Sequence, residues 1–435
     1  MISLPPALRH RRYRLLWLGL LLSIAGTQMQ AAAILWHVNG LNPQPLALAG
    51  VGAARIIPVL LFSLPAGAIA DVVDRRRLLL GTQTLLALFA ATLAVLTLAR
   101  AESLPTIYVL IAGSAAAGAL DLPARQSLMA NLVPREDLPS AFSLNSIAFH
   151  FGSIAGPSVG GLVLARWGIG YAYLLNSLSF VAVLAALIAM GPVPQFQDGT
   201  SRPPRSALHP TRLLTSMREG LSFVFSQPMI TSTMLLDFFA TFFSSATALL
   251  PIFAREILRV GAVGYGWLVA APSVGAAASA LTLTFVRRIG RQGRLLLASV
   301  AVFGLATVLF GISRSFGLTF FALAVTGAAD GVSTIVRNTI RQLQTPDYLR
   351  GRMTSVNQIF FMGGPQLGEL EAGLVAQWLG AAASVVTGGL GCLIAVLWVA
   401  RRFPALRAYD GADARPVSAT PVLGGAGPAA QRRRS

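Results

Sequence analysis

Twelve apolar stretches, each 17 to 26 residues long, follow one another along the chain and are separated by short polar segments. A helix needs about 20 apolar residues to cross a bilayer, and continuous runs exclude the alternating strands of a membrane barrel. Only 11% of the 435 residues are charged, against about a quarter in soluble domains. The sequence therefore predicts an all-α membrane protein with twelve transmembrane helices. They are expected at 15–38, 47–70, 78–99, 106–128, 141–165, 171–193, 228–253, 265–286, 295–313, 318–342, 354–379 and 384–400.

All 34 basic residues are arginine, and the loops share them unevenly. If the N-terminus is cytoplasmic, 25 arginines fall on cytoplasmic segments and five on outer loops. Because basic residues gather in cytoplasmic loops, we expect both termini to lie in the cytoplasm. We expect the protein itself to lie in a bacterial-type inner (cytoplasmic) membrane. The lipid bilayer is therefore a predicted partner, and the net charge of +18 needs no nucleic acid to explain it.

An internal repeat divides the chain into two halves of the same orientation. A shift of 212 residues maps each predicted helix onto the sixth helix after it, and parallel halves with a binding site between them are typical of transporters. We expect an N-terminal half at 15–193 and a C-terminal half at 228–400, in one pseudo-symmetric bundle. Residues 1–14 would be a cytoplasmic N-terminus, 194–227 a cytoplasmic linker with an amphipathic helix, and 401–435 a disordered cytoplasmic tail. The shift superposes Arg125 on Arg337, Pro134 on Pro346, Ser143 on Ser355, Asn145 on Asn357, Gly152 on Gly364, Gly156 on Gly368 and Gly161 on Gly373.

A charged loop, GAIADVVDRRR at 67–77, joins the second and third predicted helices. Asp71 falls where a helix leaves the membrane, so its charge is easily accommodated and can pair with arginine. Asp121 and Arg125 are four residues apart and share one helix face. The alternative is that these arginines only set the topology. The candidate gating residues are Gly67, Asp71, Asp74, Arg75, Arg76, Asp121 and Arg125.

This loop resembles the signature loop of the major facilitator superfamily, in which a glycine, three residues, an aspartate and a basic cluster follow one another. The repeat extends the resemblance over essentially the whole chain, and GTQMQAAAILWHV, LVPREDLPSAFSLNS and TPDYLRGRMTSV resemble its enterobactin-exporter and macrolide-efflux branch. The resemblance implies the major facilitator fold and a network of Asp71, Arg75 and Asp121 that shuts the inside in the outward-open state. The second half departs from the pattern, because its loop VRRIGRQGR at 286–294 has no aspartate matching Asp71.

Ionisable residues inside predicted helices are a second functional signal, because a charge at mid-membrane costs about 2.5–3.5 kcal/mol even on a mild scale. A carboxyl group in a partly dry cavity can bind and release a proton, as a proton-driven antiporter requires. Arg55 could pair with such a carboxylate across the halves, although a salt bridge without a transport role is the alternative. Glu369 and Glu371 point to nearly opposite helix faces, so we expect one of them to face the cavity. The proton-coupling candidates are Asp237, Glu369, Glu371, His150 and Arg55.

Two further patterns favour export of an amphipathic small molecule. The glycine run around Pro157 resembles the glycine-proline motif of antiporters in the superfamily, although small residues also serve ordinary close packing. Polar and aromatic side chains on the first and seventh helices suit a large amphipathic substrate, although membrane aromatics also face lipid. The cavity candidates are Gln28, Gln30, Phe239 and Phe242, with Trp36 and His37 on the first helix.

The sequence thus predicts a secondary transporter that exports a small molecule, such as a siderophore or a drug, by antiport with protons. Proton-coupled uptake of a small metabolite stays open as the alternative, because topology does not separate the two. An enzyme is disfavoured, since the chain shows no catalytic set and, without lysine, no phosphate-binding loop. We expect a monomer with no cofactor and no metal site, and no internal disulfide because Cys392 is the only cysteine.

Overall fold

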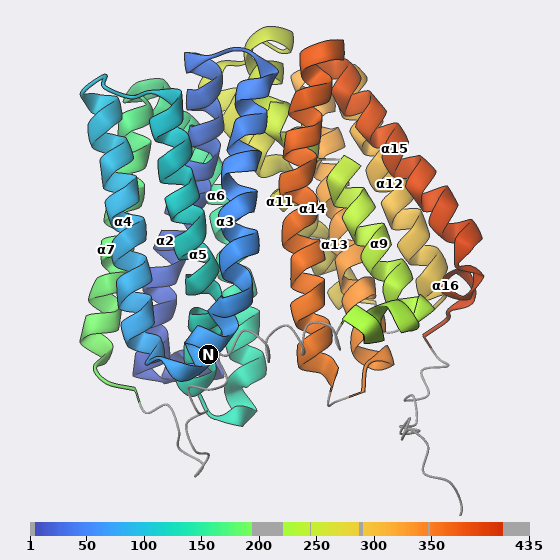
Figure 1. Cartoon of the computed structure of the whole chain (residues 1–435), viewed down its shortest axis with the longest axis horizontal. Coiled ribbons are helices and arrows are strands. Elements are labelled where there is room, and N and C mark those ends of the chain that lie inside the picture. The colour runs from blue at the N-terminus through green and yellow to red at the C-terminus, as the bar shows by residue number, and fades with distance from the viewer. Residues whose placement is uncertain (1–4, 194–220, 244, 287–289, 347–348, 412–435) are drawn as a thin grey trace, which may run out of the picture.

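A computed structural model shows a helical protein whose elements form two bundles standing side by side (Figure 1). The predicted all-α fold with two six-helix halves is confirmed. Of the predicted linker, residues 221–226 are helical, whereas 194–220 and the tail at 412–435 lie outside the described residues. The structure describes residues 5–193, 221–243, 245–286, 290–346 and 349–411.

The N-terminal half occupies the blue and green part of the chain in Figure 1, and the C-terminal half the yellow to red part. The first half consists of α1 (Pro6–Arg9), α2 (Arg11–Leu41), α3 (Pro45–Val72), α4 (Arg75–Leu98), α5 (Leu104–Asn131), the 3-10 turn η1 (Arg135–Asp137), α6 (Leu138–Arg166) and α7 (Ile169–Met190). The second consists of α9 (Pro228–Phe243), η3 (Ser245–Leu249), α10 (Leu250–Ile252), the π turn η4 (Phe253–Ile257), α11 (Gly261–Thr284), α12 (Gln292–Ile312), α13 (Phe316–Gln344), α14 (Arg350–Leu379), α15 (Ala381–Arg402) and α16 (Pro404–Ala408).

Eleven candidate spans among the described residues are long and apolar enough to cross a membrane. The twelfth long helix, α14, has 30 residues, carries Glu369 and Glu371, and packs against α9 and α15. It therefore completes the bundle by its position, although its composition is more polar than that of the others.

The seventh predicted helix, at 228–253, lies within one candidate span, Pro228–Ile257, whose helix type changes along its length. α9 ends at Phe243, and the chain continues through η3, α10 and η4 as far as Ile257. Serines at 244 and 245 follow α9 in the sequence, and serine competes with helix formation through local hydrogen bonds. Pro251 has no N–H to donate to the preceding turn. The predicted span is therefore present, and from Ser245 on its described residues depart from regular α-helical geometry.

The two halves repeat one packing scheme. In the first, α2 packs against α6 and α7, α3 against α5, and α4 against α5 and α7. In the second, α9 packs against α14 and α15, α11 against α13, and α12 against α13 and α15. The halves meet through α3 with α14 and through α6 with α11, and these two contacts are equivalent under the sequence repeat. The bundle therefore has pseudo-twofold symmetry.

Glycines of the repeat lie where the halves touch. A Cβ on Gly161 of α6 would lie 2.6 Å from the carbonyl oxygen of Ala262 in α11. A Cβ on its counterpart Gly373 of α14 would lie 2.5 Å from the Cβ of Ala49 in α3. Both positions leave no room for a side chain, so the close approach of the helices depends on glycine, as is common between membrane helices.

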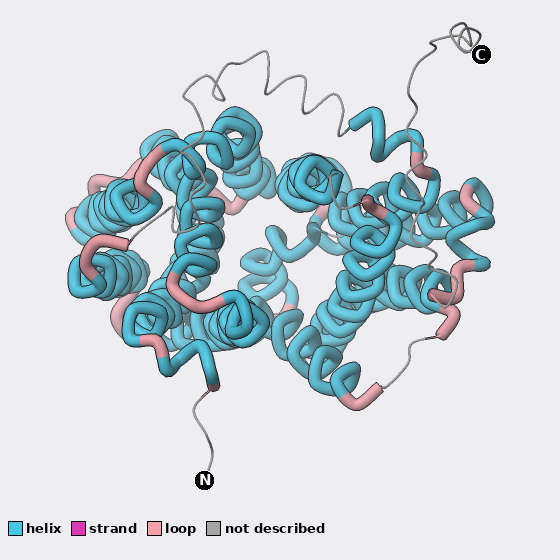
Figure 2. Tube along the Cα trace, turned by 90° about the horizontal axis from the view of Figure 1, so that it is seen from below, coloured by secondary structure: helices cyan, strands magenta, loops and turns pink. Residues whose placement is uncertain are grey.

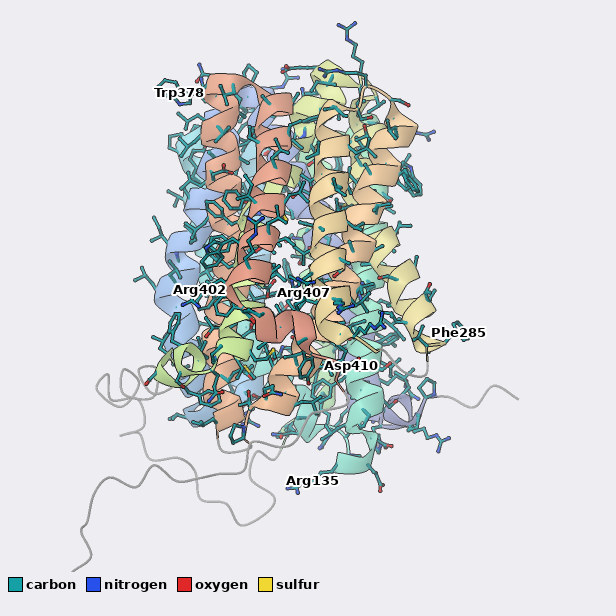
Figure 3. All side chains as sticks on the ribbon, turned by 90° about the vertical axis from the view of Figure 1, so that its right-hand side faces the viewer. Arg135, Phe285, Trp378, Arg402, Arg407 and Asp410 are labelled. Atoms are coloured by element: carbon teal, nitrogen blue, oxygen red, sulfur yellow. The ribbon has the colours of Figure 1, made fainter. Side chains whose placement is uncertain are left out.

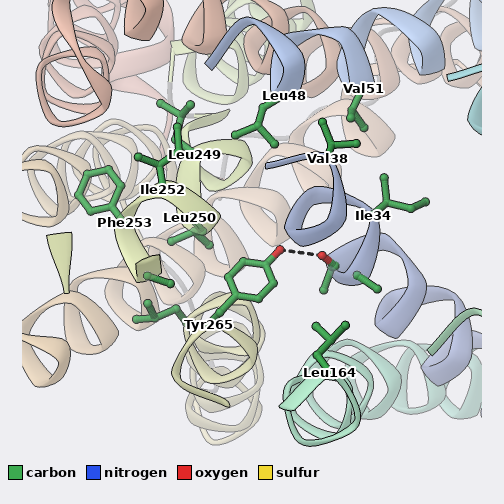
Figure 4. Close-up of a cluster of buried hydrophobic side chains, with 14 of the residues drawn as sticks. Ile34, Val38, Leu48, Val51, Leu164, Leu249, Leu250, Ile252, Phe253 and Tyr265 are labelled. Atoms are coloured by element: carbon green, nitrogen blue, oxygen red, sulfur yellow. Dashed lines mark hydrogen bonds between the residues drawn. The ribbon is translucent and has the colours of Figure 1, made fainter. Parts of the chain in front are cut away.

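The described contacts between the halves gather at one end of the bundle. We call the end where α2 stops and α15 starts the far face, and the end that carries α1 and α16 the termini face, which Figure 2 views. One buried hydrophobic cluster contains residues of both halves, and it lies toward the far face; Figure 4 shows part of it, with Val38, Leu48, Phe253 and Tyr265. The other clusters each belong to a single half. The described cores therefore join the halves at the far face and not at the termini face.

The outer surface of the bundle is apolar. Large hydrophobic side chains such as Leu61, Val109, Trp378 and Ile394 are more than half exposed. Figure 3 shows Trp378 toward the far face and Arg135 and Asp410 toward the termini face. An apolar surface of this extent would cause aggregation in water but is stable in contact with lipid tails, so the outer surface fits a bilayer.

A short segment after the last long helix folds back on the second half. Leu406 of α16 and Tyr409 are buried against α12. The N–H of Gly293 donates to the carbonyl oxygen of Tyr409 at 3.0 Å. A Cβ on Gly293 would collide with the carbonyl oxygen of Leu406, so glycine is required where the segment docks.

This segment supplies a carboxylate that the second signature loop lacks. In the first half, Asp74 precedes α4 and accepts a hydrogen bond from the N–H of Arg77 at 2.8 Å. The start of α12 has no side-chain cap at Arg291. Instead, the N–H of Arg291 donates to the carboxylate of Asp410. Asp410 therefore accepts a backbone hydrogen bond at the start of α12, although from the residue before the helix, whereas Asp74 accepts one from inside the first turn of α4.

We expect Asp410→Ala to lower the free energy of unfolding by about 1 kcal/mol, the typical net contribution of one hydrogen bond. Asp410→Asn should change it little, because asparagine caps as well as aspartate. Thermal unfolding of the purified protein in detergent measures both variants. Equal stability of the alanine variant and the unaltered protein would contradict the capping role.

Candidate functional site

Charged residues of the signature loop hold helix ends. Asp74 caps α4, and the Nε of Arg76 donates to the carbonyl oxygen of Leu187 in α7 at 2.7 Å. Arg75 is the first residue of α4. The surroundings of Gly67 and the side chain of Asp71 lie outside what the structure describes. The predicted pairing of Asp71 therefore stays a prediction.

Asp121 is a buried carboxylate of the first half, and its exposed fraction is 4%. It accepts hydrogen bonds from Thr82 at 2.9 Å and from the side-chain amide of Gln83 at 2.7 Å. The Nε of Arg125 lies 3.6 Å from its second oxygen. Asp121 therefore anchors α4 to α5 within the half, and its predicted role in a network with Arg75 stays a prediction.

An ion pair joins the halves near mid-depth. A terminal nitrogen of Arg55 in α3 lies 3.7 Å from Oε1 of Glu369 in α14. Each residue is ten positions from the far end of its helix, or about 15 Å by helical rise. Gly52 permits the approach, since a Cβ there would lie 2.9 Å from the Cβ of Glu369. The sequence suggested a pair of this kind for Arg55, and the structure places it within the contact between α3 and α14.

Glu369 keeps one oxygen without a hydrogen-bond partner. Its Oε2 is buried, and no described group bonds it. Oε1 of Gln366, one turn earlier on α14, is also buried and has no hydrogen-bond partner among the described residues. Buried polar atoms are normally satisfied, so each exception points to a group that is absent, such as a proton, a water molecule or a polar part of a ligand.

Two other coupling candidates lie apart from this pair. Glu371 is two residues further along α14 and is partly buried. His150 of α6 is partly buried too, and its ring lies edge-on to Phe149 with 6.0 Å between the ring centroids. Neither makes an ion pair among the described residues. The structure therefore brings Arg55 and Glu369 together and leaves Glu371 and His150 outside that site.

The most deeply buried charges lie inside the C-terminal half. Asp237 of α9 lies 3.0 Å from Arg337 and 3.2 Å from Arg341, both on α13, and all three are at most 3% exposed. Arg337 also lies 3.3 Å from the half-exposed Asp330, and Arg341 donates to Asn357 of α14. Neutralising Asp237 would leave two buried cations with one partly solvated carboxylate, which is costly. The cluster is therefore better suited to anchor α9 on α13 than to exchange protons.

The glutamine candidates for the cavity have partners within their own half. Gln28 donates to the hydroxyl of Ser153 in α6, and Gln30 accepts from the side chain of Asn176 in α7, both at 2.8 Å. Gln30 is buried, whereas Gln28 is partly exposed. Gln30 therefore joins helices, and Gln28 is the better placed of the two to meet a ligand.

The phenylalanine candidates belong to an aromatic group on α9. Phe242 stacks on Phe238, with ring centroids 5.7 Å apart. Phe239 lies edge-on to Trp398 of α15 at 6.1 Å. Phe239 therefore packs toward α15, whereas Phe242 lies beside a ring that also contacts α14 through Phe360.

A group that we call the far clamp, formed by Trp36, Arg255 and Tyr265, connects the halves at the far face. The guanidinium of Arg255 lies 3.8 Å from the centre of a Trp36 ring and donates to the Trp36 carbonyl oxygen at 3.1 Å. Tyr265 stacks on Trp36 at 5.0 Å and donates to the carbonyl oxygen of Ala32 at 2.9 Å, the bond dashed in Figure 4. Sequence reasoning missed this contact, because Arg255 counted only as an outer-loop charge and its partner is 219 positions away.

Metal binding finds no support in the described residues, which contain no group of three or more His, Cys, Asp or Glu side chains placed to hold an ion.

Known proteins resemble this chain over nearly its whole length. Residues 3–423 match a family model described as transmembrane secretion effector. The chain is 27% identical over 416 residues to the enterobactin exporter EntS of Escherichia coli O157:H7 (strain EC4115 / EHEC), covering 92% of this chain and 96% of that protein. It is 26% identical over 389 residues to the EntS of Shigella boydii serotype 18, covering 88% and 90%.

Solved structures with low sequence identity share the fold. A bacterial homologue of ferroportin in an inward-facing state is 18% identical with a TM-score of 0.65, covering 92% of this chain and 99% of that one. A POT family transporter is 13% identical with a TM-score of 0.71, covering 93% and 99%. The family match, the repeated halves and the helical bundle agree. The chain therefore belongs to the transmembrane secretion effector family of the major facilitator superfamily, and it is a membrane transporter.

Proposed function

We propose that the protein is a secondary active exporter of an amphipathic small molecule of the siderophore type, which it moves outward in exchange for protons. The relatives named as enterobactin exporters support both the direction and the substrate class. A chain without lysine has no P-loop lysine for ATP phosphates, which favours an ion gradient as the energy source.

The observation that carries the proposal is the one-sided closure of the bundle. Arginine distribution favours cytoplasmic termini, so the far face would be the outer one and the structure would correspond to an inward-facing state. The shared core lies at the far face, while each half has its own core at the termini face. Halves built in this way can rock against each other without unfolding, as alternating access requires.

Glu369 is the best-placed residue for proton coupling. It lies between the halves, beside Arg55, and has an unsatisfied buried oxygen. A carboxyl group there can exchange its arginine partner for a proton when the halves separate. Asp237 is held by two arginines within one half, so we assign it to the scaffold.

Locking the far face should stop transport. In a Cys392→Ser background, Leu46→Cys and Gln377→Cys place two thiols where the Gln377 side chain reaches the N–H of Leu46 at 3.4 Å. A short, reducible bis-thiol cross-linker should join them and abolish siderophore export from efflux-deficient cells, and a reductant should restore it. Each single-cysteine variant is the control. Normal export by fully cross-linked protein would refute alternating access at this face.

Glu369→Gln should abolish export driven by a proton gradient while substrate binding and folding persist, because glutamine keeps the shape but carries no exchangeable charge. Glu371→Gln, two residues away on the same helix, is the matched control and should retain export. Asp237→Asn should instead lower the unfolding temperature, since it strands two buried arginines. Export assays in vesicles with an imposed pH gradient, with thermal unfolding alongside, measure all three. Unchanged gradient dependence in Glu369→Gln would remove this residue from the coupling step.

A further inference from the structure

A buried histidine beside the far clamp has no part in the function described so far. His37 of α2 is 3% exposed. Its Nδ1 lies 3.1 Å from the hydroxyl of Tyr173 in α7, and its Nε2 lies 3.7 Å from Oε1 of Glu102, in the loop between α4 and α5. Tyr173 is fully buried, and the second oxygen of Glu102 is buried with no described hydrogen-bond partner. Three groups able to handle a proton therefore meet under the far face.

The geometry fits an imidazolium ion. In the charged form both ring nitrogens are donors, and both neighbours of His37 offer oxygen acceptors, one of them a carboxylate. In the neutral form the Tyr173 hydroxyl can donate to a bare Nδ1, but Glu102 keeps a poorly solvated charge without a cation opposite it. Protonation therefore strengthens the bond between α2 and the α4–α5 loop.

This bond acts on the contact between the halves. His37 directly follows Trp36, whose ring and carbonyl oxygen hold Arg255 of the other half. A Cβ on Gly40, one turn further along α2, would lie 3.2 Å from the Arg255 guanidinium, so this end of α2 fits closely under it. Fixing His37 against Glu102 and Tyr173 therefore holds the end of α2 where the far clamp forms.

We propose that His37, Glu102 and Tyr173 form a proton-binding site that senses pH on the far side and stabilises the far clamp when it is protonated. Charged groups around this region are Glu102 from the α4–α5 loop and, across the clamp, Arg255 and Glu256 from η4 and Arg55 of α3, which acts on Tyr265; Tyr173 and Tyr265 are the tyrosines beside it. The proposal requires the closed far face to bind the proton more tightly than the open one, through the contact with Glu102, and by linkage acid on the far side then favours closure. The proposal rests on the proposed alternation, because it requires a far face that opens.

A single reporter cysteine tests the proposal. Cys392 is replaced by serine, and Ala376→Cys places a thiol in the core shared by both halves, where Ala376 is 3% exposed. A membrane-impermeant thiol reagent added to whole cells measures opening of the far face. We expect labelling to become severalfold faster as the external pH rises from about 5.5 to 8, the range in which histidine titrates.

His37→Asn should remove this pH dependence, and so should Glu102→Gln, which keeps the shape of the site without its charge. His10 provides a matched control, because it pairs with Asp137 at 2.7 Å on the opposite face. His10→Asn should leave the response unchanged.

Each outcome decides between the hypotheses. A pH response that persists in folded His37→Asn or Glu102→Gln protein would overturn the proton site. Labelling that is independent of pH in the parent protein, with normal export, would also overturn the site but leave the transport proposal intact. A reporter that is never labelled, together with absent export, would overturn both.

Discussion

The architecture depends on the close approach of two helix pairs, α3 with α14 and α6 with α11. These contacts bring the helix backbones close together, and Gly161, Gly266 and Gly373 lie at points where a Cβ would have no room. Lipid tails are as apolar as leucine, so apolar side chains gain little by leaving them, and association within a membrane relies on fine packing. An interface of small residues also contains few interlocked side chains. The halves can therefore be firmly closed at the far face and still separate as intact units, because each keeps its own core at the termini face.

Much of this could be predicted from the sequence, because bilayer physics constrains it strongly. Long apolar runs can only be helices in lipid. The repeat aligns Gly161 of α6 with Gly373 of α14, and in the structure these two helices make the equivalent contacts with α11 and α3. The partner of Arg55 could be narrowed to a carboxylate of the other half, because an isolated buried cation is so costly.

Other features depend on contacts that only the folded chain brings together. The far clamp joins residues 219 positions apart, and Asp410 reaches α12 from beyond the last long helix. The departure from α-helical geometry between Ser245 and Ile257 was missed, since hydropathy measures composition and does not detect where serine and proline interrupt hydrogen bonding. At Glu369 the sequence itself carried the signal. The repeat aligns this residue with Pro157, so the position that holds a proline in the first half holds a carboxylate in the second.

The cluster around Asp237 has a further consequence for the chemistry open to this transporter. Guanidinium groups do not release their protons in proteins, so Arg337 and Arg341 are permanent cations, and a chain with 34 arginines and no lysine has no amine side chain to titrate. Near neutral pH, the side chains best able to take up and release protons are therefore those of its 16 acidic residues and four histidines. With Asp237 committed to fixed countercharges, the proposed proton exchange would have few side chains to draw on, and Glu369 is the carboxylate among them that pairs with an arginine of the other half.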